Sequence, residues 1–218
     1  TGLEKHEGKS DLSVDWQVAN LSSDEGWEEA VKGCDYVLHV ASPIGMELPK
    51  NEDEMVKPAV EGTLRVLKAA SKAGVKRVVI TSSVAAIMYG TDKQGVFNEE
   101  DWTDPKSRTT NVYAKSKTLA EQAAWDFIKK DTTGMELSTV LPAMVFGPIL
   151  EEDFGVSVGA ILDMMNGKYP IVPNWDMGVV DVRDVASLEL LAMTKPEAAG
   201  KRFVCSAENM FMKDQNEY

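Results

Sequence analysis

The chain has 218 residues, and 23 Lys and Arg against 35 Asp and Glu give it a formal net charge of −12 at pH 7. That length allows one ordinary domain, or one domain with a short appendage, and the negative charge argues against binding to nucleic acid or to an anionic membrane. Two cysteines are too few for a disulfide framework, and no stretch is long and apolar enough for a membrane span or a signal peptide. We therefore predict a soluble cytoplasmic protein, and no metal site, because no His or Cys lies near the acidic runs.

The first elements are predicted from an alternating pattern followed by a capping motif. Apolar and polar residues alternate over residues 14–19, which favours a strand. Ser22 is followed three positions later by Glu25, the spacing of a capping box, so we expect a helix that runs to about Val31.

A buried strand and a long helix are predicted next. The apolar run at 36–41 is typical of a strand buried on both faces of a sheet. From Pro58, which is tolerated in a first helical turn, apolar residues recur every three or four positions until Gly74, a helix-ending signal. Another buried strand is expected at 78–80.

The alternation of strands and helices continues with a helix at 110–130 and a strand at 137–141. The resulting order β-α-β-α-β-α-β, with nearly all-apolar strands, predicts an α/β fold: a doubly wound, Rossmann-like parallel sheet with helices on both faces. Beyond Pro142, helices near 156–166 and 185–193 and a strand at 202–205 are expected.

Three residues form a candidate proton-transfer site. Tyr113 and Lys117 lie four positions apart on one helix, so their side chains point the same way. A nearby ammonium would lower the pKa of the phenol, and Ser83, after a buried strand, could orient a carbonyl oxygen. The alternative is an exposed Tyr-Lys helix pair with serines that only cap a strand end.

Five further segments are informative because of their order along the chain. They are VLHVASP at 37–43, RVVITSS at 77–83, YAKSKTLAE at 113–121, LPAMVFGP at 141–148 and VDVRDVA at 180–186. Together they resemble the extended short-chain dehydrogenase/reductases of the NAD-dependent epimerase/dehydratase superfamily, and within them the dihydroflavonol reductase and cinnamoyl-CoA reductase-like group. The resemblance covers about residues 12–213.

The resemblance implies a reductase that transfers a hydride from NADPH, with NADH as the alternative cofactor, to an aldehyde or ketone. Tyr113 would be the proton donor, Lys117 would hold the nicotinamide ribose, and Ser83 would orient the carbonyl. The partner would be a small-molecule carbonyl substrate, and the protein a monomer or homodimer. Residues implied to contact the cofactor are Asn20, Leu21, Ala41, Ser42, Pro43, Thr81, Tyr113, Lys117, Pro142 and Val145.

The sequence also departs from the family pattern. A Gly-rich, pyrophosphate-binding turn should precede residue 12 and is absent from residues 1–8, and Asn20 stands where the family usually has an aspartate that touches adenine. We therefore expect an incomplete dinucleotide-binding domain at 1–148, lacking its first β-α-β unit, and a partial substrate-binding lobe at 149–218. Two alternatives stay open: a nucleotide-sugar epimerase or dehydratase, and a non-catalytic truncated relative that acts as a binding or scaffold module.

Overall fold

A four-stranded parallel sheet forms the centre of the molecule. The computed structural model describes residues 14–43, 49–150, 155–168 and 176–211. The strands are β1 (Tyr36–His39), β2 (Arg77–Thr81), β3 (Glu136–Pro142) and β6 (Arg202–Cys205), in the order β1-β2-β3-β6. Every neighbouring pair in this sheet is parallel.

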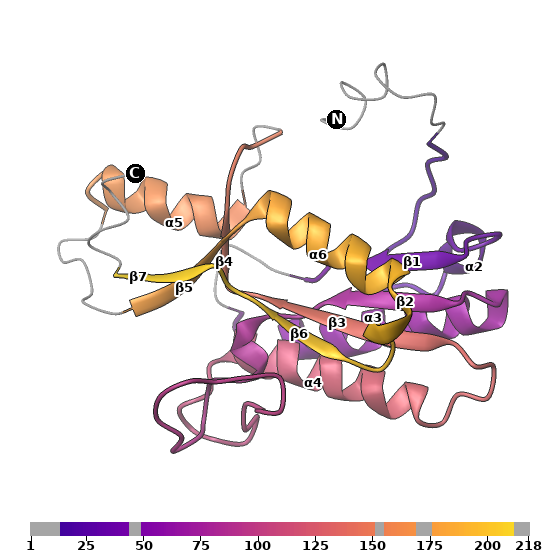
Figure 1. The fold of residues 1–218 in the computed structure, drawn as a ribbon, viewed down its shortest axis with the longest axis horizontal. Coiled ribbons are helices and arrows are strands. Elements are labelled where there is room, and N and C mark those ends of the chain that lie inside the picture. The colour runs from indigo at the N-terminus through magenta and orange to yellow at the C-terminus, as the bar shows by residue number, and fades with distance from the viewer. Residues whose placement is uncertain (1–13, 44–48, 151–154, 169–175, 212–218) are drawn as a thin grey trace.

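Helices cover both faces of this sheet. Helices α3 (Asp53–Ala73) and α4 (Val112–Ile128) lie on one face, and α6 (Val182–Thr194) lies on the other (Figure 1). The predicted doubly wound, Rossmann-like arrangement is thus confirmed. Within the described part of the chain, no helix combines the length and the apolar character that crossing a bilayer requires.

A second, three-stranded sheet stands beside the first. It consists of β4 (Met144–Phe146), β5 (Asp176–Asp181) and β7 (Glu208–Phe211), with β4 and β5 parallel and β5 and β7 antiparallel. Helix α5 (Gly155–Met165) accompanies it in Figure 1. The helices α5 and α6 and the strand β6 were predicted from the sequence, whereas β4, β5 and β7 were not. Short helical turns complete the fold: α2 (Trp27–Ala30), η1 (Val84–Ala86) and η2 (Pro196–Ala198).

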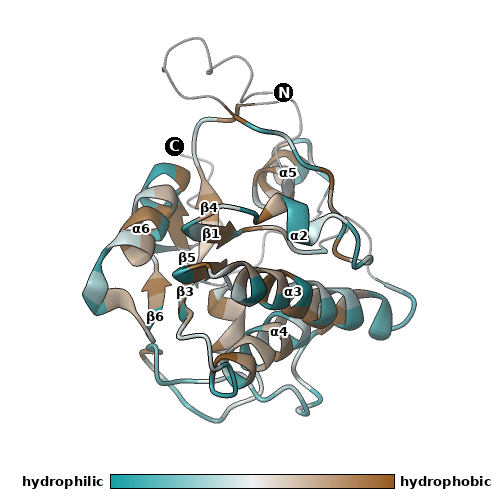
Figure 2. Ribbon diagram, turned by 90° about the vertical axis from the view of Figure 1, so that its right-hand side faces the viewer, coloured by the Kyte–Doolittle hydropathy of each residue, from teal (hydrophilic) through white to brown (hydrophobic). Residues whose placement is uncertain are grey.

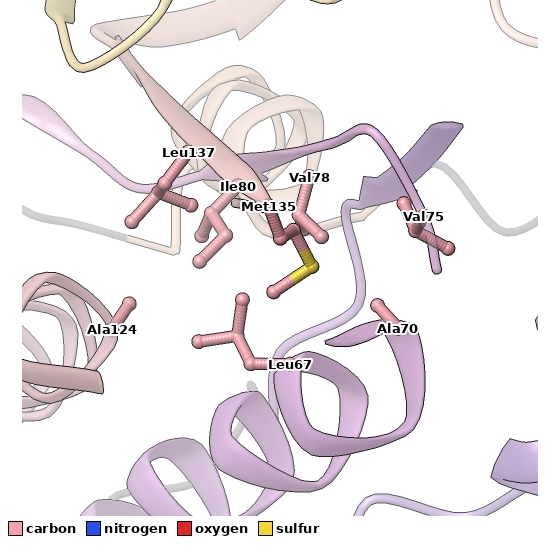
Figure 3. Close-up of a cluster of buried hydrophobic side chains, with 8 residues drawn as sticks. All are labelled: Leu67, Ala70, Val75, Val78, Ile80, Ala124, Met135 and Leu137. Atoms are coloured by element: carbon pink, nitrogen blue, oxygen red, sulfur yellow. The ribbon is translucent and has the colours of Figure 1, made fainter. Parts of the chain in front are cut away.

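The main core lies between the sheet and the α3–α4 layer. Leu67 of α3 points toward the strands and meets Val78, Ile80 and Leu137, while Ala124 of α4 closes the cluster from the side (Figure 3). These side chains are buried, and burial of apolar surface is the main force that holds the layers together. The strands are largely hydrophobic, whereas the covering helices carry both polar and apolar residues (Figure 2). This packing fixes the carboxyl ends of β2 and β3 relative to α4.

The N-terminal predictions were wrong in two places. Residues 14–19 are extended but form no strand, and Val18 is 92% exposed. A strand needs a neighbour to pair its backbone, and no described strand lies beside these residues. The capping box at Ser22 does not form, because the Ser22 amide donates to the Asn20 side chain in a turn, and α2 is limited to four residues.

Strand β1 differs from the prediction of a strand buried on both faces. Tyr36, Leu38 and Val40 are exposed, with Val40 at 57%. The reason is position: β1 is the edge strand of the described sheet, so only β2 flanks it.

Helix α3 begins earlier than the sequence indicates. It starts at Asp53, where the Asn51 side chain accepts the Asp53 amide at 3.1 Å, so Pro58 lies in the second turn rather than the first. The helix tolerates this proline within its length, although proline removes one amide donor.

Gly74 ends α3 as predicted, in the left-handed conformation with φ of 76° and its amide bonded to the Ala70 and Ser71 carbonyls. A Cβ at this position would meet nothing within 4 Å, so only backbone strain opposes a larger residue. We expect Gly74→Ala to lower the free energy of unfolding by roughly 1 kcal/mol. Chemical denaturation measures this change, and Lys68→Ala on the exposed side of the same helix should change it by less than about 0.5 kcal/mol.

Candidate active site

Several predicted site residues meet at the carboxyl ends of β1 and β2, where α/β sheets bind their ligands. Ala41, Ser42, Thr81 and Lys117 line one small cavity together with His39. Its volume is about 20 Å³, which is room for about one water molecule. The structure therefore brings four of the predicted cofactor-contacting residues to one place.

Ser83 and Tyr113 also lie together. Ser83 lies two residues after the end of β2 and caps η1 by accepting a hydrogen bond from the Ala85 amide at 3.1 Å, which fixes its side chain. Tyr113 stands in the first turn of α4, and the Asn111 side chain caps that turn by accepting the Ala114 amide at 2.8 Å. The Ser83 hydroxyl lies close enough to the Tyr113 phenol to lower its pKa. Two chain segments thirty residues apart in sequence thus place two hydroxyls side by side, as the sequence predicted.

The protonation of Tyr113 differs from the expectation. Burial raises the pKa of the phenol, the hydrogen bond from Ser83 opposes that rise, and nearby Tyr89 adds to it. Lys117 does not lower the pKa of Tyr113 as predicted, because its ammonium turns instead to the Thr81 carbonyl, at 3.2 Å. Tyr113 therefore keeps its proton at neutral pH, which suits a proton donor.

Lys117 is a buried cation. Its residue is 7% exposed, and loss of hydration lowers the pKa of its ammonium to about 8, against an opposing attraction from Glu121. His39 lies on the same cavity and is also buried. Burial, and then the charge of Lys117, lower the pKa of His39 to about 4, so the imidazole is neutral at pH 7.

The remaining predicted cofactor residues do not line this cavity. Pro142 pairs with Cys205 at the end of β3, and Val145 packs on the core beside β6. Asn20 and Leu21 lie against α3, where the Leu21 carbonyl accepts from Arg65 at 2.9 Å, and neither lines the cavity. Pro43 follows Ser42 but does not line the cavity either.

The structure adds two acidic residues that the sequence did not single out. Glu189 of α6 is buried and accepts a hydrogen bond from the Thr81 hydroxyl. Glu121 of α4 is 1% exposed and lines the cavity beside Lys117. The sequence signals for Glu121 are its place at the end of the 113–121 motif and, two helical turns after Tyr113, on the buried side of α4. Within the described ranges, no group of three or more His, Cys, Asp or Glu could hold a metal ion.

Comparisons with known proteins agree with these features. A family model described as the NAD dependent epimerase/dehydratase family matches residues 3–206. Cinnamoyl-CoA reductase CAD2 of Medicago truncatula is 38% identical over 189 residues, a match that covers 84% of this chain and 57% of that protein. Anthocyanidin reductase of Vitis vinifera is 34% identical, with 88% of this chain and 60% of that protein covered. The chain thus spans less than two thirds of these curated relatives.

Solved structures resemble the fold over most of its length. Yeast methylglyoxal/isovaleraldehyde reductase Gre2, complexed with NADPH, superposes with a TM-score of 0.82 at 31% identity. This match covers 97% of the present chain and 68% of the yeast chain. Vestitone reductase from alfalfa (Medicago sativa) gives a TM-score of 0.74 at 29% identity, covering 91% of this chain and 63% of its own.

Proposed function

The chain belongs to the NAD-dependent epimerase/dehydratase family, and from that premise we propose that the protein is an NADPH-dependent reductase of aldehydes or ketones. The observation that carries the proposal is the meeting of Ser83, Tyr113 and the buried Lys117 at one end of the sheet, where the Ser83 hydroxyl acts on the Tyr113 phenol and Lys117 donates to the Thr81 carbonyl at 3.2 Å. The matched reductases, one of them in complex with NADPH, support the same reaction class.

The donor set at the strand ends fits a nicotinamide ribose. The Lys117 ammonium and the Ser42 hydroxyl can donate to ribose hydroxyls, while the Thr81 hydroxyl, whose proton goes to Glu189, can accept from them. Because the cavity holds only about one water molecule, we place the dinucleotide beyond it, at the ends of the strands. NADPH, when bound, supplies the hydride.

The protein's own groups position the substrate and move one proton. Ser83 donates a hydrogen bond to the substrate carbonyl oxygen. This hydrogen bond becomes stronger as negative charge develops on that oxygen. Tyr113 gives its phenolic proton to that oxygen, and the raised pKa ensures that the proton is present at neutral pH. Lys117, whose ammonium donates to the Thr81 carbonyl at 3.2 Å, would hold the nicotinamide ribose at the same strand end.

The two parts of the chain divide the work in this proposal. Residues 1–148, which include β1, β2, β3 and α4, would contribute the dinucleotide-binding and catalytic groups. Residues 149–218 would contribute to a substrate-binding lobe, although β6 from this part completes the main sheet. Substrates would be small molecules.

A fluorescence titration of the whole protein with NADPH, followed by an assay of NADPH oxidation, tests the proposal. We expect a dissociation constant in the micromolar range, weaker binding of NADH, and oxidation of NADPH when isovaleraldehyde or methylglyoxal is added. Those two aldehydes are chosen from the name of the yeast relative. Tight NADPH binding without oxidation of any carbonyl probe would favour a binding module, and absence of binding would contradict the proposal.

A further inference from the structure

A buried carboxylate stands behind the candidate active site. Glu121 is 1% exposed, and both of its oxygens are bonded. Oε1 accepts from Thr139 at 2.8 Å, Trp125 at 3.2 Å and Arg202 Nε at 2.7 Å, while Oε2 accepts from Ser82 at 2.6 Å and Arg202 Nη2 at 3.3 Å. The carboxylate thus accepts five hydrogen bonds from four neighbouring side chains, which hold it in one place.

Arg202 of β6 is the cation that neutralises this carboxylate. Its side chain is 9% exposed, its Nη1 donates to the Glu99 and Asp101 carbonyls at 2.7 and 2.8 Å, and its guanidinium stacks on the Trp102 ring at 3.6 Å from the centroid. The guanidinium is therefore held on all sides, so it fixes the carboxylate of Glu121 in one orientation.

The same carboxylate reaches the active site by two routes. Its Oε2 accepts a hydrogen bond from the hydroxyl of Ser82, the residue between Thr81 and Ser83. Glu121 thus anchors the segment that carries the candidate catalytic serine from the end of β2. Glu121 also lies one helical turn after Lys117, and both line the cavity at the strand ends.

We propose that Glu121 is a positioning residue of the reductase: it fixes the Ser82–Ser83 segment after β2 and places a negative charge beside Lys117, while Arg202 fixes the orientation of Glu121. This inference rests on the proposed function. It goes beyond that function by assigning a role to a charge pair from α4 and β6 that touches neither the substrate nor Tyr113.

The electrostatic part follows from the groups that face Lys117. Burial lowers the pKa of Lys117, and the attraction of Glu121 opposes that fall. The titratable groups around Lys117 are neutral His39 of β1, Tyr113 and Glu121 of α4, and Glu189 of α6, which reaches Thr81. Removal of the Glu121 charge is therefore expected to lower the pKa of Lys117, and removal of Arg202 is expected to raise it.

Opposite substitutions in this pair test the proposal. We assign the fall of kcat at high pH to loss of the Lys117 proton. In Glu121→Gln, which keeps the size of the side chain, this fall should occur at a pH lower by roughly one unit. In Arg202→Gln it should occur at a higher pH. The pKa of Lys117 is measured in parallel by NMR of ¹³C-labelled lysine side chains, assigned with Lys117→Arg, because this readout does not depend on turnover.

Glu136→Gln is the matched control. Glu136 binds buried Arg77 at 2.6 Å at the opposite ends of β2 and β3, so its loss also leaves a buried arginine without its carboxylate. We expect this variant to lose stability, as the Glu121 variant does, but to leave both the fall of kcat at high pH and the pKa of Lys117 in place.

The outcomes separate this inference from the proposed function. Shifts of opposite sign in the two variants support the positioning role, and unchanged or same-direction shifts overturn it. If Glu121→Gln does not fold, Arg202→Gln decides alone, because an unchanged or lower pKa of Lys117 contradicts the proposal. Failure of the reductase assignment would appear instead as a wild-type protein that does not oxidise NADPH while the NMR shifts remain measurable.

Discussion

Replacement of Tyr113 by phenylalanine is expected to lower kcat by roughly 10³-fold, the usual range for loss of a general acid, while NADPH binding stays nearly unchanged. The hydroxyl that the substitution removes lies beside that of Ser83 and is the only proton donor that we assign to the carbonyl oxygen. The ring itself remains, so the packing of the first turn of α4 should persist. Steady-state rates of NADPH oxidation and a fluorescence titration of the same sample measure the two quantities.

Tyr89→Phe provides a matched control for Tyr113→Phe. Tyr89 is a second tyrosine close enough to raise the pKa of Tyr113, and the substitution removes the same atom from it. We expect it to change kcat only slightly. If Tyr113→Phe keeps turnover similar to that of Tyr89→Phe, Tyr113 is not the proton donor and the catalytic assignment is wrong.

The central sheet was predictable because its signals are local. Strands β2 and β3 are nearly all apolar, and α4 carries an apolar face at helical spacing, so each element is visible in its own stretch of sequence. The second sheet was missed for the opposite reason. Its strands β4, β5 and β7 are short, and what defines them is their pairing with one another across the chain.

The candidate site was predictable in its members and not in its electrostatics. The contact of Ser83 with Tyr113 follows from the rule that strand ends and helix starts meet at one edge of an α/β sheet. The direction of the shift in the pKa of Tyr113 does not, because it depends on burial and on where the Lys117 ammonium points. The Glu121–Arg202 pair was also out of reach, since its members lie 81 positions apart.

The second large effect that we expect is a loss of stability at acidic pH, caused by His39. The pKa of its imidazole falls from 6.5 in the unfolded chain to about 4 in the folded protein, because burial and the charge of Lys117 both disfavour the imidazolium. As the pH falls from about 6.5 to about 4, the unfolded state takes up a proton that the folded state refuses. His39 therefore does not lower the free energy of unfolding above pH 6.5. Between about pH 6.5 and pH 4 it lowers that free energy progressively, by roughly 3 kcal/mol in all.

His39→Gln should flatten this dependence, because glutamine does not titrate. The free energy of unfolding, measured by urea denaturation at several pH values between 7.5 and 4, should fall less steeply in the variant than in the wild type. Thr63→Val is the control, since Thr63 lies 3.5 Å from His39 Nε2 and its loss leaves the histidine free to titrate, so the slope should remain. Equal slopes in His39→Gln and the wild type would contradict a buried neutral imidazole. A flattened slope would instead indicate that the buried cavity beside Lys117 excludes a second positive charge.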